Sequence, residues 1–403
     1  MIYDEIEIPY GCYWSTPFAK WQGALQHLHS FEFAAWVLKR ELARRAIEPA
    51  LITHAVLGTT VIQHHGFYGL PWLTGMAGLD HVTGPTINQA CATSARCLAT
   101  AAQELETGGA TTYLAATADR TSNGPHVFYP NPAGPGGTGD AENIVLDSFA
   151  HDPFAKNSML QTAENVAKEA GITREAQEEL TLLRYSQYAN ALADDSAFLK
   201  RYMPWPLEVK DARGKKVIAT LKGDQGVFPT TGAGLAALRP VLEGGTVTFG
   251  TQTHPADGNA GMILTAGRDR ARALSPDAKI DVQLLSFGQA RVKKGFMPMA
   301  VVPAAQVALS RAGLDISGIA AFTSHTPFAL NDVYFARTLG VDPEKMNRHG
   351  CSLVWGHPQG PTGMRSVIEL IEDLASCGGG YGLFTGCAAG DSAAAVVLKV
   401  SGR

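Results

Sequence analysis

The sequence predicts a layered α/β protein built from two similar halves, with an inserted segment of loops and helices between them. Three observations support this prediction. Short apolar runs alternate with longer stretches of helical periodicity, as in layered α/β proteins. A helix, glycine turn and strand occur in that order near both ends of the chain. Between these two copies, loops rich in Pro, Gly and Asn lead into charged helical segments.

The first copy begins with a helix predicted over residues 93–105, where apolar side chains recur at helical spacing. Thr93 or Ser94 can cap its start, and the glycines at 108–109 can end it. Residues 113–118 then form an apolar run of strand length. This order predicts a helix that turns back into a buried strand.

The second copy repeats the order, with a helix predicted over 364–374, glycines at 378–380 and a strand over 381–385. Thirteen residues separate an arginine from the glycine turn in both copies, Arg96 from Gly109 and Arg365 from Gly378. A shared spacing of this kind indicates a duplicated α/β unit.

The middle of the chain differs from both copies in composition and in predicted secondary structure. Residues 131–140, NPAGPGGTGD, are a loop by composition, and 161–169 and 174–193 are predicted to be solvent-facing amphipathic helices. The predicted organisation therefore has three parts: an N-terminal half from 1–119 and 246–275, an inserted domain at 120–245, and a C-terminal half at 276–403.

Composition narrows the class of protein. The 403 residues are 45% hydrophobic, enough for a sizeable core, and the formal net charge of -4 provides no basic field for nucleic acid or an acidic membrane surface. The start of the sequence lacks a signal-peptide pattern, and no apolar run approaches eighteen residues. The six cysteines form no CxxC pair and no zinc-ligand cluster is present. We expect a cytoplasmic enzyme with small-molecule substrates, reduced thiols and no metal.

Cys91 lies in TINQACATS, between an apolar strand and the start of the helix predicted at 93–105. A helix N-terminus lowers the pKa of a nearby thiol, and its free N–H groups can hold a developing oxyanion. The alternative is a small buried apolar residue, which is the usual role of an arbitrary cysteine. The position favours a nucleophile.

Two further residues, His357 and Cys387, lie at positions where a side chain could take part in catalysis. His357, in GHPQGPTGMR, is held by glycines and prolines just before a helix, where a neutral imidazole can accept the thiol proton of Cys91. Cys387, in GCAAGDSAAA, ends a strand and precedes small residues that let a ligand approach the backbone. Taken alone, His357 fits a surface histidine and Cys387 a core cysteine.

Together these motifs occur in the order found in thiolases, and the chain resembles that family along essentially its whole length. TPFAKWQGAL resembles the family's TPF-G-GGL opening, and SNGP resembles its SNAP. MLQTAENVAKEAGITREAQEEL resembles the M-G-TAENVA helix with the R-EQDE stretch, and LRPVLEGGTVTFG resembles LRP-F--GTVTAG. MPMAVVPAAQVALSRAGL resembles the segment that ends in the G-GP-PA helix.

The resemblance implies a five-layered α/β/α/β/α fold of two similar halves, with a loop domain that binds coenzyme A. It assigns Cys91 as nucleophile, His357 as the base that activates it, and Cys387 as the acid/base at the substrate α-carbon. The implied reaction is acyl transfer between Cys91 and coenzyme A, with cleavage or Claisen formation of the carbon–carbon bond of a 3-oxoacyl-CoA. Coenzyme A is then a co-substrate, no cofactor is permanently bound, and a homodimer or dimer of dimers is expected.

The chain departs from the family at the Asn-Glu-Ala-Phe motif, which here is His-Thr-Pro-Phe at 325–328. This form is closer to the His-Asp-x-Phe of sterol-carrier-protein-type thiolases. By this resemblance His325 replaces the asparagine at the enolate oxyanion hole, although a loop histidine without a catalytic part remains the alternative. A second oxyanion hole would use the backbone N–H groups of Cys91 and Ala389.

Further departures fall where the family binds coenzyme A. Ser158 stands where many members have a histidine before Met159, and Thr253-His254 replaces the Ser-Gly that lines the pantetheine path. By resemblance these four residues and Ala389 are the candidates for contact with coenzyme A.

Three other functions stay open. A ketosynthase-like condensing enzyme would use Cys91, His325 and His357 as a Cys-His-His set, but it has no need of Cys387. A scaffold or coenzyme A-binding subunit would need none of these reactive groups. A catalytic thiolase subunit could also work with a small zinc-ribbon/OB-fold partner, which would be a separate polypeptide.

Overall fold

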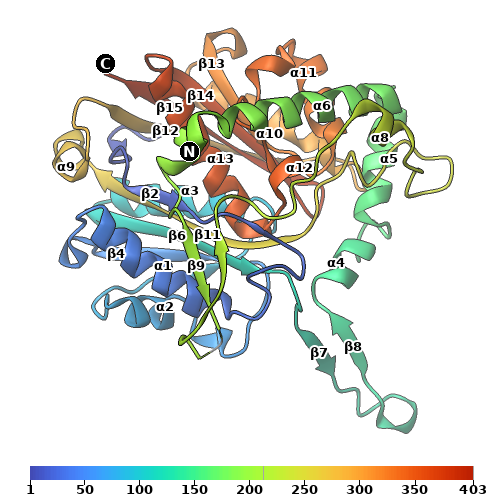
Figure 1. Ribbon diagram of the computed structural model, residues 1–403, viewed down its shortest axis with the longest axis horizontal. Coiled ribbons are helices and arrows are strands. Elements are labelled where there is room, and N and C mark those ends of the chain that lie inside the picture. Colours follow the sequence, from blue (N-terminus) through green and yellow to red (C-terminus); the bar gives the residue numbers. More distant parts are fainter. Residues whose placement is uncertain (212, 403) are drawn as a thin grey trace.

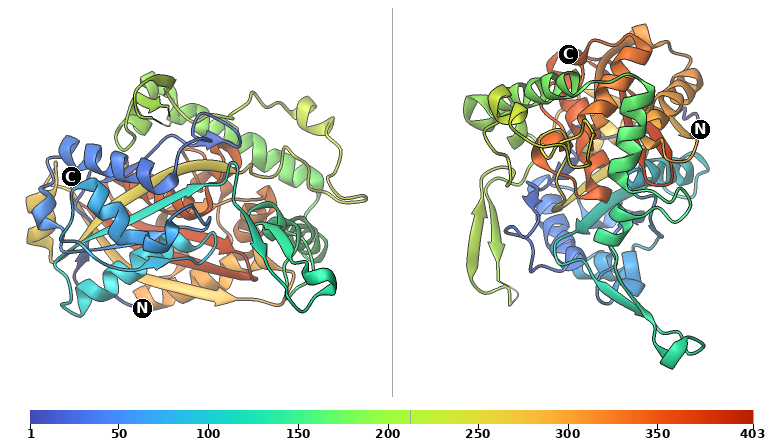
Figure 2. Two further views of the ribbon diagram at one scale, coloured as in Figure 1. Left: turned by 90° about the horizontal axis from the view of Figure 1, so that it is seen from below. Right: turned by 90° about the vertical axis from the view of Figure 1, so that its right-hand side faces the viewer.

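The computed structural model describes residues 1–211 and 213–402, and its elements form five layers (Figure 1). Residues 212 and 403, which belong to the predicted ranges 120–245 and 276–403, lie outside this description. Two helices run through the middle of the molecule, a sheet lies on either side of them, and further helices cover the outer faces (Figure 2).

The N-terminal sheet contains two parallel strand pairings and one long strand that runs antiparallel to its neighbour. Strand β4 pairs in parallel with β5 and β6, and β11 runs antiparallel to β6. The short strands β2 and β3 also pair with β11. Helices α1 and α2 cover the outer face of this sheet. Their bounds are β2 Tyr13–Ser15, β3 Ala19–Lys20, α1 Ser30–Arg44, β4 His54–Gly58, α2 Gly69–Ala77, β5 Thr86–Ile87, β6 Thr112–Arg120 and β11 Ala256–Ala266.

The C-terminal sheet repeats this plan. Strand β13 pairs in parallel with β14, and β15 lies between β14 and β12 with antiparallel pairing to both. Helices α10 and α11 pack on its outer face. Their bounds are β12 Asp281–Arg291, α10 Val301–Ala312, β13 Ile319–His325, α11 Ala329–Leu339, β14 Gly380–Ala388 and β15 Ser392–Ser401. The short helices α9 (Arg268–Leu274) and α12 (Ser352–Trp355) lie in connections.

Strand β1, Ile6–Glu7, joins the two sheets because it pairs with β11 on one side and with β12 on the other. This link was not predicted, since a strand of two residues is too short to show a periodic pattern. All eleven strands of the two halves therefore belong to one continuous hydrogen-bonded sheet.

The predicted duplication is confirmed by the two central helices, α3 (Thr93–Glu106) and α13 (Gln359–Ser376). Each leads through a glycine turn into its strand, β6 or β14. In β6 successive residues face different cores: Tyr113 packs with the central helices and Leu114 with α1 and α2. Burial on both faces explains why these strands appear as continuous apolar runs.

The predicted capping of α3 is wrong. Ala92 occupies the N-cap position, the Thr93 hydroxyl donates to the Ala90 carbonyl, and the Ser94 hydroxyl donates to the Gly360 carbonyl of α13. Both hydroxyls are used in the turn before the helix and in contact with the partner helix. The helices approach each other closely at Gly363, where an added Cβ would lie 3.0 Å from the Ser94 Cβ.

The segment between β6 and β11 leaves the layered body (Figures 1 and 2). It begins with a projecting hairpin whose turn contains the predicted loop. The helices predicted at 161–169 and 174–193 are confirmed as α5 and α6, but α6 is not simply solvent-facing: its Arg184 is buried against Asp332 of α11, 2.8 Å away. The elements are β7 His126–Tyr129, β8 Asp140–Asn143, α4 Leu146–Ala150, α5 Met159–Glu169, α6 Arg174–Ala191, α7 Ala193–Lys200, β9 Leu207–Lys210, β10 Val217–Leu221 and α8 Gly232–Ala236.

None of the helices in the described residues combines the length and the apolar character needed to cross a membrane.

Candidate active site

The structure brings Cys91 and His357 together although 266 residues separate them in the sequence. Cys91 lies just before α3 and His357 just before α13, so the starts of the two central helices converge. The Cys91 Sγ is 3.3 Å from the His357 Nε2, within hydrogen-bonding distance for sulfur. Each half of the molecule therefore contributes one member of a thiol and imidazole pair.

Thr362 determines which nitrogen of His357 carries the proton. Its Oγ1 lies 2.7 Å from the Pro358 carbonyl oxygen, which can only accept, so the hydroxyl hydrogen points there. The same Oγ1 lies 2.6 Å from the His357 Nδ1 and must accept a hydrogen from it. The lone pair of Nε2 consequently faces the Cys91 thiol. This is the tautomer that a base requires.

The expected lowering of the Cys91 pKa is wrong. Burial raises the pKa of this thiol to about 12, and the nearby Asp119 carboxylate acts in the same direction. Burial also holds the pKa of His357 well below its usual value, with His325 and His254 adding to the effect. The helix N-terminus is outweighed by desolvation. The resting pair is a neutral thiol beside a neutral imidazole.

Two backbone N–H groups oppose this rise in the Cys91 pKa, those of Ala389 and of Cys91 itself. They belong to the turn after β14 and to the turn before α3. Donors that favour negative charge on the sulfur also stand where an oxyanion beside that sulfur would develop. Their positions agree with the pair predicted from the sequence, and the oxyanion-hole role stays a prediction.

Cys387 is buried near the end of β14, on the other side of the site. Burial raises its pKa above that of an ordinary thiol, and the nearby Cys91 adds to this. The side-chain amide of Asn331 donates to its Sγ across 3.2 Å and opposes the rise. The three residues named as reactive from sequence thus gather in one place.

His325 stacks on His357, with ring centroids 4.0 Å apart. Burial lowers the pKa of His325 to about 4, so this ring is also neutral. Its Nδ1 lies 3.2 Å from the Cys387 carbonyl oxygen and therefore carries the proton. Its Nε2 is buried without a hydrogen-bond partner among the described residues and presents a lone pair. In this tautomer His325 accepts at Nε2, so donation to an enolate oxygen needs a proton added there.

Cys91, His325 and His357 also form a group whose donor atoms lie within 4.8 Å of one another. Thiolate and imidazole are the ligands that zinc prefers. The two rings stack with their planes 30° apart, and the His357 Nε2 is already paired with the Cys91 Sγ.

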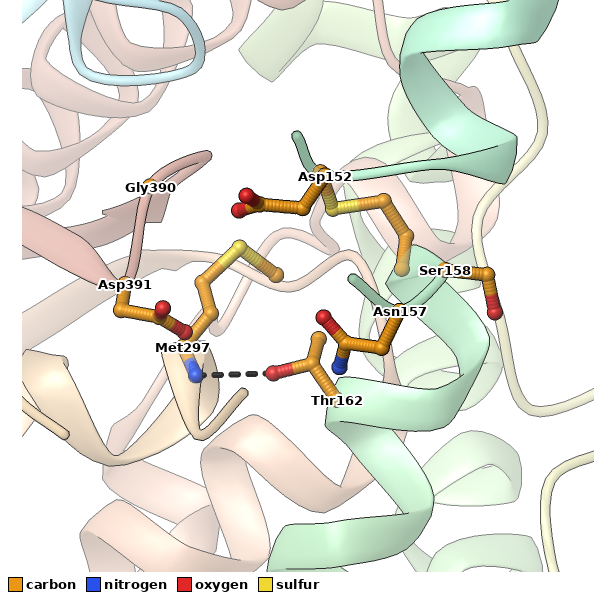
Figure 3. Close-up of a pocket in the computed structure, with 8 residues that line it drawn as sticks. Asp152, Asn157, Ser158, Thr162, Met297, Gly390 and Asp391 are labelled. Atoms are coloured by element: carbon orange, nitrogen blue, oxygen red, sulfur yellow. Dashed lines mark hydrogen bonds between the residues drawn. The ribbon is translucent and has the colours of Figure 1, made fainter. Parts of the chain in front are cut away.

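Ser158 and Met159 lie at the start of α5. The Ser158 hydroxyl accepts a hydrogen bond from the Gln161 N–H across 3.1 Å and caps this helix. The side chain that was predicted to contact coenzyme A therefore already has a structural role. Both residues line a small pocket that reaches Gly390, next to Ala389 (Figure 3). The Ser158 side chain points away from Met297 and Asp391, which lie at the opposite side of that pocket (Figure 3).

Thr253 and His254 lie directly behind the His357 loop. The Thr253 hydroxyl donates to the Ser352 carbonyl across 2.5 Å, and the His254 carbonyl accepts the His357 N–H across 2.9 Å. The His254 ring lies between two glycines, because a Cβ on Gly226 or Gly356 would approach its Nε2 to 2.9 or 2.7 Å. His254 therefore supports the base through its backbone.

Sequence reasoning missed three residues of the site: Thr362, Asn331 and Asp119. The buried Asp119 carboxylate accepts the N–H groups of Thr60 at 2.8 Å and Gly360 at 2.6 Å. It ties the end of β6 to the start of α13. Thr362 could have been found from its place five residues after His357 at a helix start, whereas no local pattern marks Asn331 or Asp119.

Comparison with known proteins identifies the family. Models of the thiolase N-terminal and C-terminal domains match residues 14–268 and 278–400. The acetyl-CoA acetyltransferase of Escherichia coli K12 is 31% identical over 95% of this chain and 96% of its own length. The beta-ketothiolase BktB of Cupriavidus necator is 29% identical over 95% of this chain and 96% of its own length.

Solved structures show the same fold. The acetyl-CoA acetyltransferase of Bacillus anthracis superposes with a TM-score of 0.90 at 24% identity, covering 99% of both chains. Human mitochondrial 3-ketoacyl-CoA thiolase, solved in complex with CoA, superposes with a TM-score of 0.88 at 23% identity, covering 98% of both chains. The chain therefore belongs to the thiolase family.

Proposed function

We propose that this thiolase transfers an acyl group through a thioester on Cys91 and cleaves or forms the carbon–carbon bond of a 3-oxoacyl-CoA. The main support is the 3.3 Å contact between the Cys91 Sγ and the His357 Nε2, whose lone pair is directed at the thiol by Thr362. Relatives named as acetyl-CoA acetyltransferase and beta-ketothiolase support the same class of acyl transfer.

In the cleavage direction, His357 takes the thiol proton as the Cys91 sulfur attacks the 3-keto carbon. The backbone N–H groups of Cys91 and Ala389 stabilise the oxyanion that forms. The carbon–carbon bond then breaks, its electron pair moves to the α-carbon, and Cys387 donates a proton there. The proton held by His357 replaces the one that Cys387 gives up. Acetyl-CoA leaves, and the acyl group stays on Cys91.

In the second half-reaction, the thiol of coenzyme A loses its proton to His357 and attacks the thioester, which releases the Cys91 thiolate. His357 then returns the proton to the Cys91 sulfur. We assign coenzyme A binding to the inserted segment 120–245 together with Met159, Thr253 and His254. Ser158 would act there by holding the start of α5, as its hydroxyl is already bonded to Gln161. Coenzyme A is a co-substrate in this scheme and not a resident cofactor.

One observation favours a second candidate, a ketosynthase-like condensation. Cys91, His325 and His357 lie close together, as a Cys-His-His set requires. Assaying purified protein with 3-oxoacyl-CoA plus coenzyme A, in parallel with acyl-CoA plus malonyl-CoA, separates the two reactions. We expect turnover in the first mixture, and turnover in the second mixture alone would reject the thiolase assignment.

We further propose a cytoplasmic homodimer or dimer of dimers. Light scattering of the purified chain measures its oligomeric state. A small zinc-ribbon/OB-fold protein that co-purifies from the native source, and on which thiolysis depends, would support the alternative of a two-protein enzyme.

A further inference from the structure

Asn331 lies in the first turn of α11 with only 1% of its surface exposed. Its Nδ2 donates to the Cys387 Sγ across 3.2 Å, while its Oδ1 is buried without a hydrogen-bond partner among the described residues. A buried amide with an unsatisfied oxygen costs stability. The side chain is therefore poorly explained as a structural device and better explained by its contact with the sulfur.

The next residue along the helix fixes this amide in place. Asp332 accepts hydrogen bonds from Arg184 at 2.8 Å, from the Ser324 hydroxyl at 2.6 Å and from the Asn347 amide at 3.0 Å. Arg184 comes from the inserted segment and Ser324 from β13. The first turn of α11 is thus held from two sides, and Asn331 has little freedom to leave the sulfur.

An N–H donor is bonded more strongly by a thiolate than by a thiol, because hydrogen bonds to ionised acceptors are the stronger ones. Desolvation by the protein interior and the nearby Asp332 carboxylate act against negative charge on Cys387, whereas its own backbone N–H and the Asn331 amide favour that charge. His325 is hydrogen-bonded to the backbone carbonyl of Cys387 and not to its sulfur. Asn331 is consequently the side chain that favours the thiolate.

We propose that Asn331 is a positioning residue for proton transfer at the substrate α-carbon, acting through Cys387. This inference rests on the role given to Cys387 above. In cleavage, Cys387 becomes a thiolate as it gives its proton to the α-carbon. In carbon–carbon bond formation, the thiolate takes the α-proton. The Cys387 thiolate takes part in both directions, as the product of proton donation in cleavage and as the base in bond formation, so Asn331 assists both, whereas acyl transfer at Cys91 does not use it.

The test compares Asn331→Leu, which keeps the size and removes the donor, with Thr385→Val as a matched control. Thr385 is buried on β14 two residues before Cys387, and its hydroxyl donates to the Val301 carbonyl and not to the sulfur. Three rates are measured for each protein: cleavage of a 3-oxoacyl-CoA, deuterium uptake at the α-carbon of acetyl-CoA in heavy water, and exchange of a simple acyl group between Cys91 and coenzyme A.

We expect Asn331→Leu to slow cleavage and deuterium uptake by about 10- to 100-fold, the value of a hydrogen bond to a charged group, while acyl exchange stays near the wild-type rate. The ascending, low-pH limb of the pH profile of deuterium uptake, which reports deprotonation of Cys387, should move to higher pH. Asn331→Asp, which keeps the shape and brings a negative charge to the sulfur, should lose at least as much. Thr385→Val should leave all three rates close to wild type.

An equal loss in all three rates, no loss in any of them, or an unmoved ascending limb would overturn the role of Asn331. A Cys387→Ser protein separates this failure from failure of the proposed function. Wild-type cleavage by Cys387→Ser would remove the role of Cys387 itself. Impaired cleavage by Cys387→Ser beside normal cleavage by Asn331→Leu would reject the inference about Asn331 alone. If both roles hold, adding Asn331→Leu to Cys387→Ser causes little further loss.

Discussion

The two halves of the molecule share a framework but carry different chemistry. A constant offset of 269 residues relates Arg96 to Arg365 and Gly109 to Gly378, and the structure shows a helix, glycine turn and strand in both places. At that offset Cys91 corresponds to Gly360, and Cys387 corresponds to Ala118. Each half therefore has a small residue where the other has a reactive cysteine.

This difference shows that neither half contains a complete site. The nucleophile comes from the start of α3, whereas its base and the second cysteine come from the start of α13 and the end of β14. Even the small residue Gly360 takes part, because its N–H bonds the Asp119 carboxylate of the other half. Variants in each half should consequently fail in different ways.

The largest effect is expected from removing the nucleophile, Cys91, which the N-terminal half contributes to the site. Cys91→Ala should abolish acyl-enzyme formation and lower turnover by about 10⁵- to 10⁶-fold, the scale found when a catalytic nucleophile is deleted. Intact-protein mass spectrometry after addition of substrate detects the acyl group. Cys97→Ala, at a buried cysteine of the same helix, is the matched control and should still be acylated. A stable acyl mass on Cys91→Ala would show that another residue is the nucleophile.

His357→Ala should impair both half-reactions, because each needs a sulfur to lose its proton. A loss toward the upper end of about 10²- to 10⁴-fold is expected for a general base. Rapid mixing measures acylation of Cys91 and, separately, transfer from the preformed acyl-enzyme to coenzyme A. His349→Ala, a partly exposed histidine outside the site, serves as control. Transfer at the wild-type rate would refute the role of His357.

Cys387→Ser should divide the two activities and so sharpen the contrast between the cysteines. Serine keeps the size but holds its proton far more tightly, so cleavage of 3-oxoacyl-CoA should fall by about 10²- to 10⁴-fold. Acyl exchange from a donor without the 3-keto group breaks no carbon–carbon bond and should be largely spared. Equal losses in both assays would indicate structural damage, and no loss in either would make Cys387 an ordinary core residue.

The smallest effect concerns stability and pH. In the folded protein burial lowers the pKa of His325 from 6.5 to about 4, so the unfolded chain binds a proton first as the pH falls. The free energy of unfolding should therefore decrease between about pH 6.5 and 4, with a contribution from His325 of about 2 kcal/mol at pH 5. Urea unfolding of wild type and His325→Asn at pH 7 and pH 5 measures it. The variant should lose less stability on acidification, and an equal loss would contradict the prediction.

The sequence predicted those parts of the fold and site that leave a local pattern. Cys91, His357 and Cys387 were singled out because each lies where a strand or helix begins or ends, and the resemblance to thiolases supplied their roles. Asn331 was missed because its contact joins residues 56 positions apart, on a helix start and a strand end without a shared motif. The direction of the Cys91 pKa was missed for a related reason: a helix start is visible in sequence, whereas the desolvation that outweighs it arises only from tertiary packing.

The crossing of the central helices has a consequence for how this catalyst can be adjusted. Ser94 and Gly363 correspond at the 269-residue offset, and they also lie side by side, because a Cβ added to Gly363 would come within 3.0 Å of the Ser94 Cβ. Because Cys91 and His357 lie just before these two helices, a side chain added at Gly363 would press on Ser94 and so act on the spacing of the helices that carry the sulfur and the imidazole. A single methyl group at this contact would act as a spacer between the two helices. A substitution at Gly363 could thus change the distance between the Cys91 sulfur and the His357 imidazole without altering any residue that faces the substrate.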